Sequence, residues 1–153
     1  MPEPERTSGP LSRRIVLTMA GGALLASSCF AWADESAKAE IAKILAGRTA
    51  KPGGIKLDVP SIAENGLVVP VTVEAESPMT ETDHIKVIHL FAEGNPNPLV
   101  ASFHFTPLSG RAAASTRMRL AQTQNVVVFA ETASGEVRTA SAEIKVTIGG
   151  CGG

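Results

Sequence analysis

The stretch Val137-Arg138-Thr139-Ala140-Ser141-Ala142-Glu143-Ile144-Lys145-Val146-Thr147-Ile148 decides the fold, because its side chains alternate between two chemical kinds. Every second residue from Ala140 to Ile148 is apolar, and the residues between them are polar or charged. A period of two is typical of a strand with one face on a hydrophobic core and the other toward solvent. We therefore expect a long last strand, with Ile148 as its final anchor in the core.

Six more strands are predicted upstream, four from the same alternation, one (85–91) from a run that is apolar on both faces and reads as a central strand, and one (126–130) from a short buried run. They are Ile55–Val59, Leu67–Ala75, Ile85–Phe91, Leu99–Phe105, Ala112–Leu120 and Val126–Ala130. Leu99 is expected to face inward, and Pro70, which lacks an N–H, is expected at a sheet edge or a bulge. Turn signals such as Asn65-Gly66 and Ser109-Gly110 separate the strands. The pattern predicts an all-β protein, an immunoglobulin-like β-sandwich of about seven antiparallel strands.

One short helix precedes the strands. Ser36 is placed to cap it, Ile41, Ile44 and Leu45 fall on one face, and Gly47 is placed to end it. We expect this helix, from Asp34 to Gly47, to lie on the sandwich rather than to build it. The segment Lys51-Pro52-Gly53-Gly54 that follows reads as a turn.

The first residues have the order of an export signal. Arg13-Arg14 precedes an apolar run from Ile15 to Trp32, and Ala31-Trp32-Ala33 is a small-residue cleavage site. The paired arginines favour the twin-arginine route to the periplasm. A membrane-spanning helix is the weaker interpretation, because glycine and serine pairs break the apolar run. We predict a signal peptide over 1–33, a sandwich domain over 34–148 and a mobile arm over 149–153.

Removal of residues 1–33 leaves 11 Lys and Arg (14 minus 3) against 13 Asp and Glu (15 minus 2), a net charge of −2. The mature chain has no basic run, which disfavours nucleic acid as a partner, and we expect no membrane contact after cleavage. Its only cysteine is Cys151, since Cys29 leaves with the signal. A lone cysteine in an oxidising compartment indicates an intermolecular bond or a reactive group.

No other residues form a pattern that indicates catalysis. The histidines His84, His89 and His104 lack metal-ligand spacing, and no nucleophile elbow, phosphate-binding loop or dinucleotide fingerprint is present. We therefore expect no cofactor. The arginines of one hairpin region, Arg111, Arg117 and Arg119, are interpreted as a solvated sheet face or, alternatively, as a contact for an acidic protein surface.

The chain finishes in Gly149-Gly150-Cys151-Gly152-Gly153. Glycine has no side chain to pack, so we expect this segment to be a flexible arm. No base or cation adjoins Cys151, so the thiol is poorly suited to catalysis and well suited to presentation to other proteins' active sites. Two alternatives stay open, a structural sandwich whose cysteine only cross-links dimers and a copper or zinc chaperone using Cys151 with a histidine.

The chain resembles the SoxY family, the sulfur-carrier subunits of the periplasmic thiosulfate-oxidising Sox system. The similarity rests on the terminal Gly-Gly-Cys-Gly-Gly, the twin-arginine signal, and several internal segments. These are Glu76-Ser77-Pro78-Met79-Thr80, Ile88-His89-Leu90-Phe91, Asn95-Pro96-Asn97-Pro98, Ser115-Thr116-Arg117-Met118-Arg119-Leu120 and Ala140-Ser141-Ala142-Glu143-Ile144.

The resemblance implies a function and a set of partners. Members pair with SoxZ as a heterodimer and hold sulfur covalently on the arm cysteine, here Cys151. The cytochrome SoxAX joins thiosulfate to the thiol, and the hydrolase SoxB releases sulfate. SoxCD, where present, oxidises the remaining sulfur. The resemblance therefore implies a carrier rather than an enzyme.

Overall fold

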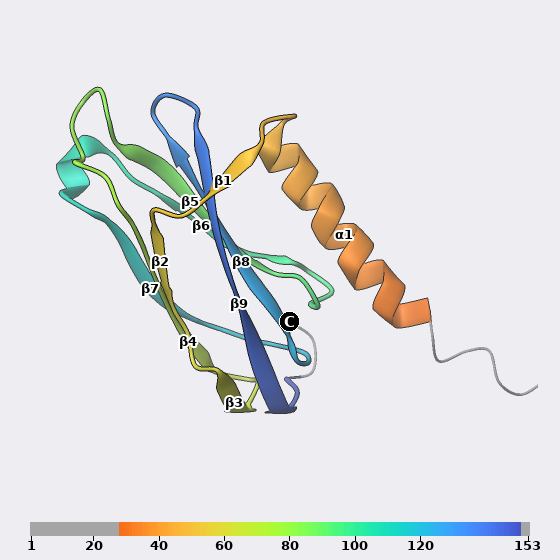
Figure 1. Ribbon diagram of the computed structural model, residues 1–153. Helices are drawn as coiled ribbons and strands as arrows, with labels where there is room; N and C mark the ends of the chain where they lie inside the picture. Colours follow the sequence, from red (N-terminus) through yellow and green to blue (C-terminus); the bar gives the residue numbers. More distant parts are fainter. Residues whose placement is uncertain (1–27, 151–153) are drawn as a thin grey trace, which may run out of the picture.

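The computed structural model describes residues 28–150, with side chains from Glu35 onward (Figure 1). The predicted signal, with Arg13 and Arg14, lies outside the described residues. So do Cys151, Gly152 and Gly153.

Two β-sheets pack face to face in a sandwich, and one helix lies outside them. The elements are α1 Ser28–Leu45, β1 Ala50–Pro52, β2 Ile55–Asp58, β3 Ile62–Asn65, β4 Val69–Ala75, β5 Ile85–Ala92, β6 Leu99–His104, the 3-10 helix η1 Pro107–Ser109, β7 Ala112–Met118, β8 Gln124–Thr132 and β9 Val137–Ile148. One sheet has the order β1-β9-β8-β5-β6, with β3 also on β9, and the other has the order β2-β4-β7. The prediction of an all-β sandwich with one N-terminal helix is confirmed.

All seven predicted strands are present, and two short strands are added. Both additions, β1 and β3, run parallel to β9: Ala50 pairs with Val137 near its start, and Asn65 pairs with Ile148 at its end. The expectation of a wholly antiparallel sandwich is therefore wrong for these two pairings. Segments of three and four residues are too short to show a period of two, and only the long β9 beside them makes them strands.

The core lies between the sheets. On β4, Val69, Val71 and Val73 are buried, and their neighbours, including Pro70, face solvent. Pro70 lies in β4, the central strand of its sheet, opposite Arg117 of β7. The pairing of β4 with β2 reaches only Thr72, so the predicted edge position holds for the β2 side of Pro70 alone. Strand β5 is buried on both faces, as its continuous apolar run predicts.

Two residues predicted to face inward are exposed instead. Ile148 is 66% exposed, because β9 continues past the opposite sheet and Ile144 is its last fully buried residue. Leu99 is 38% exposed because β6 is an edge strand.

Helix α1 begins at Ser28, earlier than predicted, so Ser36 lies inside the helix and does not cap it. The alanine-rich sequence around residues 31–42 continues the helix, since alanine has the highest helix propensity. The helix ends at Leu45, two residues before the predicted end at Gly47, which follows in a left-handed conformation with φ 80°. Ile41, Ile44 and Leu45 pack on the outer face of the larger sheet, against Phe91, Phe129 and Val137.

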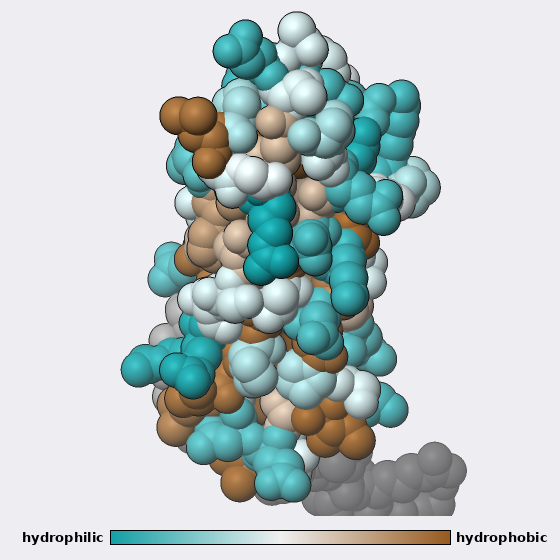
Figure 2. Space-filling view, turned by 90° about the vertical axis from the view of Figure 1, so that its left-hand side faces the viewer, coloured by the Kyte–Doolittle hydropathy of each residue, from teal (hydrophilic) through white to brown (hydrophobic). Residues whose placement is uncertain are grey.

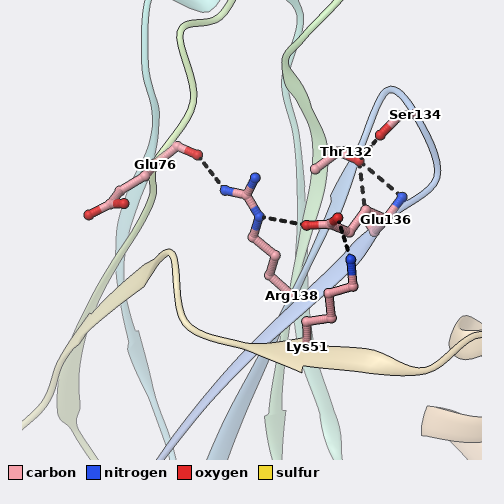
Figure 3. A network of polar contacts seen from close by, with 6 residues as sticks. All are labelled: Lys51, Glu76, Thr132, Ser134, Glu136 and Arg138. Carbon is pink, nitrogen blue, oxygen red and sulfur yellow. Dashed lines mark hydrogen bonds and ion pairs between the residues drawn. The ribbon is translucent and has the colours of Figure 1, made fainter.

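A polar network joins β1 to the hairpin between β8 and β9 (Figure 3). The Glu136 carboxylate accepts hydrogen bonds from Lys51 at 2.9 Å and from Arg138 at 3.2 Å. Arg138 also donates to the backbone oxygen of Glu76 at 2.8 Å, which connects the two sheets. The hydrogen bonds from Lys51 and Arg138 lower the pKa of Glu136. Side-chain hydrogen bonds therefore connect the strands at this end of the sandwich.

Arg48 connects the end of α1 to the larger sheet through hydrogen bonds. Its guanidinium donates to the last carbonyls of the helix, those of Ile44 at 2.8 Å and Leu45 at 3.0 Å, and to Glu131 of β8 at 3.0 Å. The hydrogen bond from Arg48 lowers the pKa of the Glu131 carboxyl. A carboxyl with a lowered pKa stabilises the folded state at a pH above its unfolded value, and this contribution is lost as the pH falls through the folded value.

We predict that Glu131→Gln lowers the melting temperature slightly at pH 7, because the ion pair with Arg48 is lost. The difference from the parent should begin to shrink as the pH falls below about 4.5, the ordinary pKa of a glutamate, and should vanish once the pH has passed through the lower pKa that Glu131 has in the folded protein. Glu143→Gln, at an exposed position of β9, is the matched control and should change little. A Glu131→Gln deficit that stays constant down to pH 2 would contradict the assignment. Thermal unfolding followed by circular dichroism across this range measures both.

Candidate functional site at the root of the arm

Strand β9 carries the chain to one end of the sandwich, where the glycine segment begins. At this end β3 lies beside the last residues of β9 (Figure 1). The turn after β3 and the turn between β7 and β8 meet here. Gly149 and Gly150 leave β9 between these two turns.

Three backbone hydrogen bonds join these segments. The N–H of Gly66 donates to the Ile148 oxygen at 2.7 Å, and the N–H of Leu120 donates to the Gly66 oxygen at 2.7 Å. The N–H of Gly150 then donates to the Leu120 oxygen at 2.9 Å. We call Gly66, Leu120 and Ala121 the arm cradle, because together they surround Gly149 and Gly150.

The cradle leaves no space for side chains. A Cβ on Gly66 would collide with the Leu120 oxygen, and one on Gly149 would collide with the Ala121 oxygen. A Cβ on Gly150, which is buried, would lie only 2.9 Å from the Gly66 oxygen. Glycine is needed at these three positions for close backbone approach, since real Cβ atoms do not come so near.

This geometry corrects one expectation from the sequence. The glycine segment was expected to have no means of packing, and this is wrong for Gly149 and Gly150. Packing here uses backbone contacts, which need no side chains. For Cys151, Gly152 and Gly153, which lie outside the described residues, a flexible arm stays a prediction.

Two buried amide side chains, those of Asn95 and Gln124, hold the backbone next to the cradle in place. Asn95 donates to the Arg119 oxygen at 2.8 Å and accepts from the Ala121 N–H at 3.0 Å. Gln124 donates to the same Asn95 oxygen at 2.9 Å and accepts from the Gly94 N–H at 2.7 Å. Asn95 is 2% exposed and Gln124 is 7% exposed, so water cannot replace these bonds. They fix the backbone that receives Gly150.

The histidines lie apart from this end. His84 Nδ1 is 3.0 Å from the Thr80 oxygen, and His89 Nδ1 is 2.7 Å from Ser102 Oγ. Burial lowers the pKa of His89. His104 ends β6 and is exposed. Within residues 28–150, no three side chains of metal-binding types lie close enough together to hold an ion.

The predicted arginine face is present. Arg111, Arg117 and Arg119 are all exposed, and Arg117 lies opposite Pro70 in the pairing of β4 with β7. None of them makes an ion pair within the part of the chain that the structure describes. Arg119 directly precedes the cradle residue Leu120, so a cation lies close to the root of the arm.

In the same described part, no helix is both long and apolar enough to span a membrane.

The fold and the arm root together define a class of protein. It is a small two-sheet sandwich in which the last strand ends at one end of the fold and is followed in the sequence by a glycine-flanked cysteine. The family described as "Sulfur oxidation protein SoxY" matches residues 41–151, and the chain belongs to this family. The match takes in the cradle and runs to Cys151.

Solved structures agree with this membership. The sulfur carrier protein SoxY from Chlorobium limicola f thiosulfatophilum is 35% identical, with a TM-score of 0.63, over 74% of this chain and 98% of that one. A superoxide reductase (neelaredoxin) from Ignicoccus hospitalis has a TM-score of 0.55 at 21% identity, over 61% of this chain and 80% of that one, and shows similarity of fold alone. A search of curated proteins found no match.

We predict that Gly66→Ala lowers the free energy of unfolding by about 3 kcal/mol, because the new methyl group overlaps the Leu120 backbone. Gly47→Ala is the comparison, since Gly47 has a left-handed backbone but open space around it, and should cost about 1 kcal/mol. Urea unfolding of both variants measures the difference. Equal losses would mean that the cradle does not require glycine.

Proposed function

We propose that this protein carries sulfur covalently on Cys151 in the periplasm and presents it to the enzymes of a thiosulfate-oxidising system. The observation that carries the proposal is the SoxY family match, which extends to Cys151. The structural relative from Chlorobium limicola is described as a sulfur carrier protein, and it is matched over nearly its whole length. The arm root supports the proposal, because the chain is held by a backbone hydrogen bond at Gly150, the residue directly before Cys151.

The chemistry divides between the carrier and its enzymes. Joining thiosulfate to the Cys151 thiol forms a sulfur–sulfur bond, releases one proton and passes two electrons to the cytochrome SoxAX. Water then cleaves the bond to the terminal sulfone in SoxB, which frees sulfate and leaves a persulfide on Cys151. In this division the carrier supplies the thiol and the partner enzymes supply the oxidant and the hydrolytic centre. The protein itself is therefore a carrier and not an enzyme.

The proposed partners follow from the same family membership. SoxZ forms the heterodimer, and SoxAX, SoxB and, where present, SoxCD bind transiently. Covalent attachment keeps reactive sulfur from diffusing away between these enzymes. It also gives the bound sulfur a high effective concentration at each active site.

The carrier role predicts that Cys151→Ser abolishes thiosulfate oxidation in the reconstituted system, since serine cannot form a sulfur–sulfur bond. Intact mass of the parent after incubation with thiosulfate and SoxAX should show a thiosulfonate adduct on the C-terminal peptide. Cys29→Ser is the matched control, because the proposal places Cys29 in the removed signal, and it should behave like the parent. Thiosulfate oxidation by Cys151→Ser at the parent's rate would exclude the carrier role.

The proposed export is tested separately. Changing both Arg13 and Arg14 to lysine should stop translocation, because the twin-arginine route recognises this pair. The parent isolated from the periplasm should begin at Asp34, as read by mass spectrometry. Normal export of the double variant, or a different first residue, would contradict the predicted signal.

A further inference from the structure

Exposed apolar side chains gather around the root of the arm. Of the six large hydrophobic residues that are exposed in the described part of the chain, four are at this end. They are Ile62, Leu67, Val68 and Ile148, with exposed fractions of 60%, 45%, 60% and 66%. Exposed large apolar side chains that gather at one end of a protein commonly mark an interaction site, so this end indicates an interface.

The four residues, which we call the root patch, belong to adjoining segments. Ile148 is bonded through its oxygen to the N–H of Gly66, and Leu67 and Val68 follow Gly66 directly. Ile62 begins β3, which pairs with the end of β9. In Figure 2 several brown groups lie in the lower part of the molecule, interspersed with teal, and further brown or tan surface lies higher up. The segments that carry the root patch are therefore the ones that form or adjoin the cradle.

The cradle places Gly150, the residue directly before Cys151, close to this surface. Consecutive Cα atoms are about 3.8 Å apart, so the Cys151 sulfur stays within roughly 7 Å of the Gly150 Cα. Gly150 itself touches the backbone of Leu67, since a Cβ on it would lie 3.1 Å from the Leu67 nitrogen. An active site that encloses a reacting group extends several ångströms around it. An enzyme that reaches Cys151 must therefore also meet the residues around Gly150.

We infer that the root patch docks against an apolar rim at the mouth of the enzymes that act on sulfur bound to Cys151. The inference rests on the proposed carrier function and adds to it a surface beside the arm. When the arm enters the active-site mouth, the root-patch side chains are buried against its rim and stabilise the complex. When the arm leaves, this contact is lost. A subunit bound permanently on this patch would block access to the neighbouring thiol, so a transient enzyme fits the position better than a fixed subunit or a second copy of this chain.

The test compares two sets of surface variants of the full chain in its heterodimer, loaded with thiosulfonate. Leu67→Ser/Val68→Ser should reduce kcat/KM for sulfate release by SoxB roughly tenfold, through a higher KM. The matched control Leu108→Ser removes a side chain that is 97% exposed in η1, at the far end of the sandwich, and should leave kcat/KM unchanged. Alkylation of the unloaded thiol by iodoacetamide should proceed equally in all three proteins, because a small reagent needs no docking surface.

Three results would overturn the inference. The first is an unchanged kcat/KM in Leu67→Ser/Val68→Ser. The second is alkylation that falls as much as sulfate release, which would show that the substitutions act on the arm itself. The third is weakened SoxZ binding or altered self-association with normal sulfate release per heterodimer, which would assign the patch to a subunit. A parent protein that never acquires the adduct would instead reject the carrier function, so the two failures are distinguishable.

Discussion

The two hydrogen bonds of the Gly66 backbone hold the functional end of this protein together. One N–H binds the end of β9 and one oxygen binds the turn after β7, so a single residue joins the last strand to the opposite side of the sandwich. The Leu120 oxygen then receives Gly150. Because these contacts use the backbone alone, they require glycine where the segments of the chain meet. The arm therefore leaves the fold at Gly150 rather than at Ile148.

A fixed root changes how a glycine-rich cysteine arm works. A chain that left the fold at Ile148 would separate Cys151 from the fold by two free glycines, whereas a root held at Gly150 leaves Cys151 directly after a held residue. A shorter free segment raises the effective concentration of the thiol at any active site that docks at this end. A free segment that begins after Gly150 is shorter than one that begins after Ile148, so an enzyme that acts on Cys151 must approach the protein surface. The same geometry therefore links the carrier function to the exposed apolar side chains around the cradle.

Sequence patterns predicted the main strands because alternation along β4 and β9 reports directly on burial. They missed β1 and β3, which are strands only through their pairing with β9. They placed Ile148 in the core, since periodicity does not show where the opposite sheet ends. Glycine composition suggested freedom at Gly149 and Gly150, and only the fold brings Gly66 and Leu120 against them. The amide pair of Asn95 and Gln124 was missed for the same reason, because its residues lie far apart in the chain.

The arm is held at Gly150 by a backbone hydrogen bond to Leu120. Amide hydrogen exchange at Gly150 in the native protein measures this bond directly, since only a bonded and buried N–H is protected. With the arm held at Gly150, we expect exchange at least roughly 100-fold slower than in an unstructured peptide. Exchange at the free-peptide rate would show instead that the arm begins at the end of β9 and that Gly150 is not held.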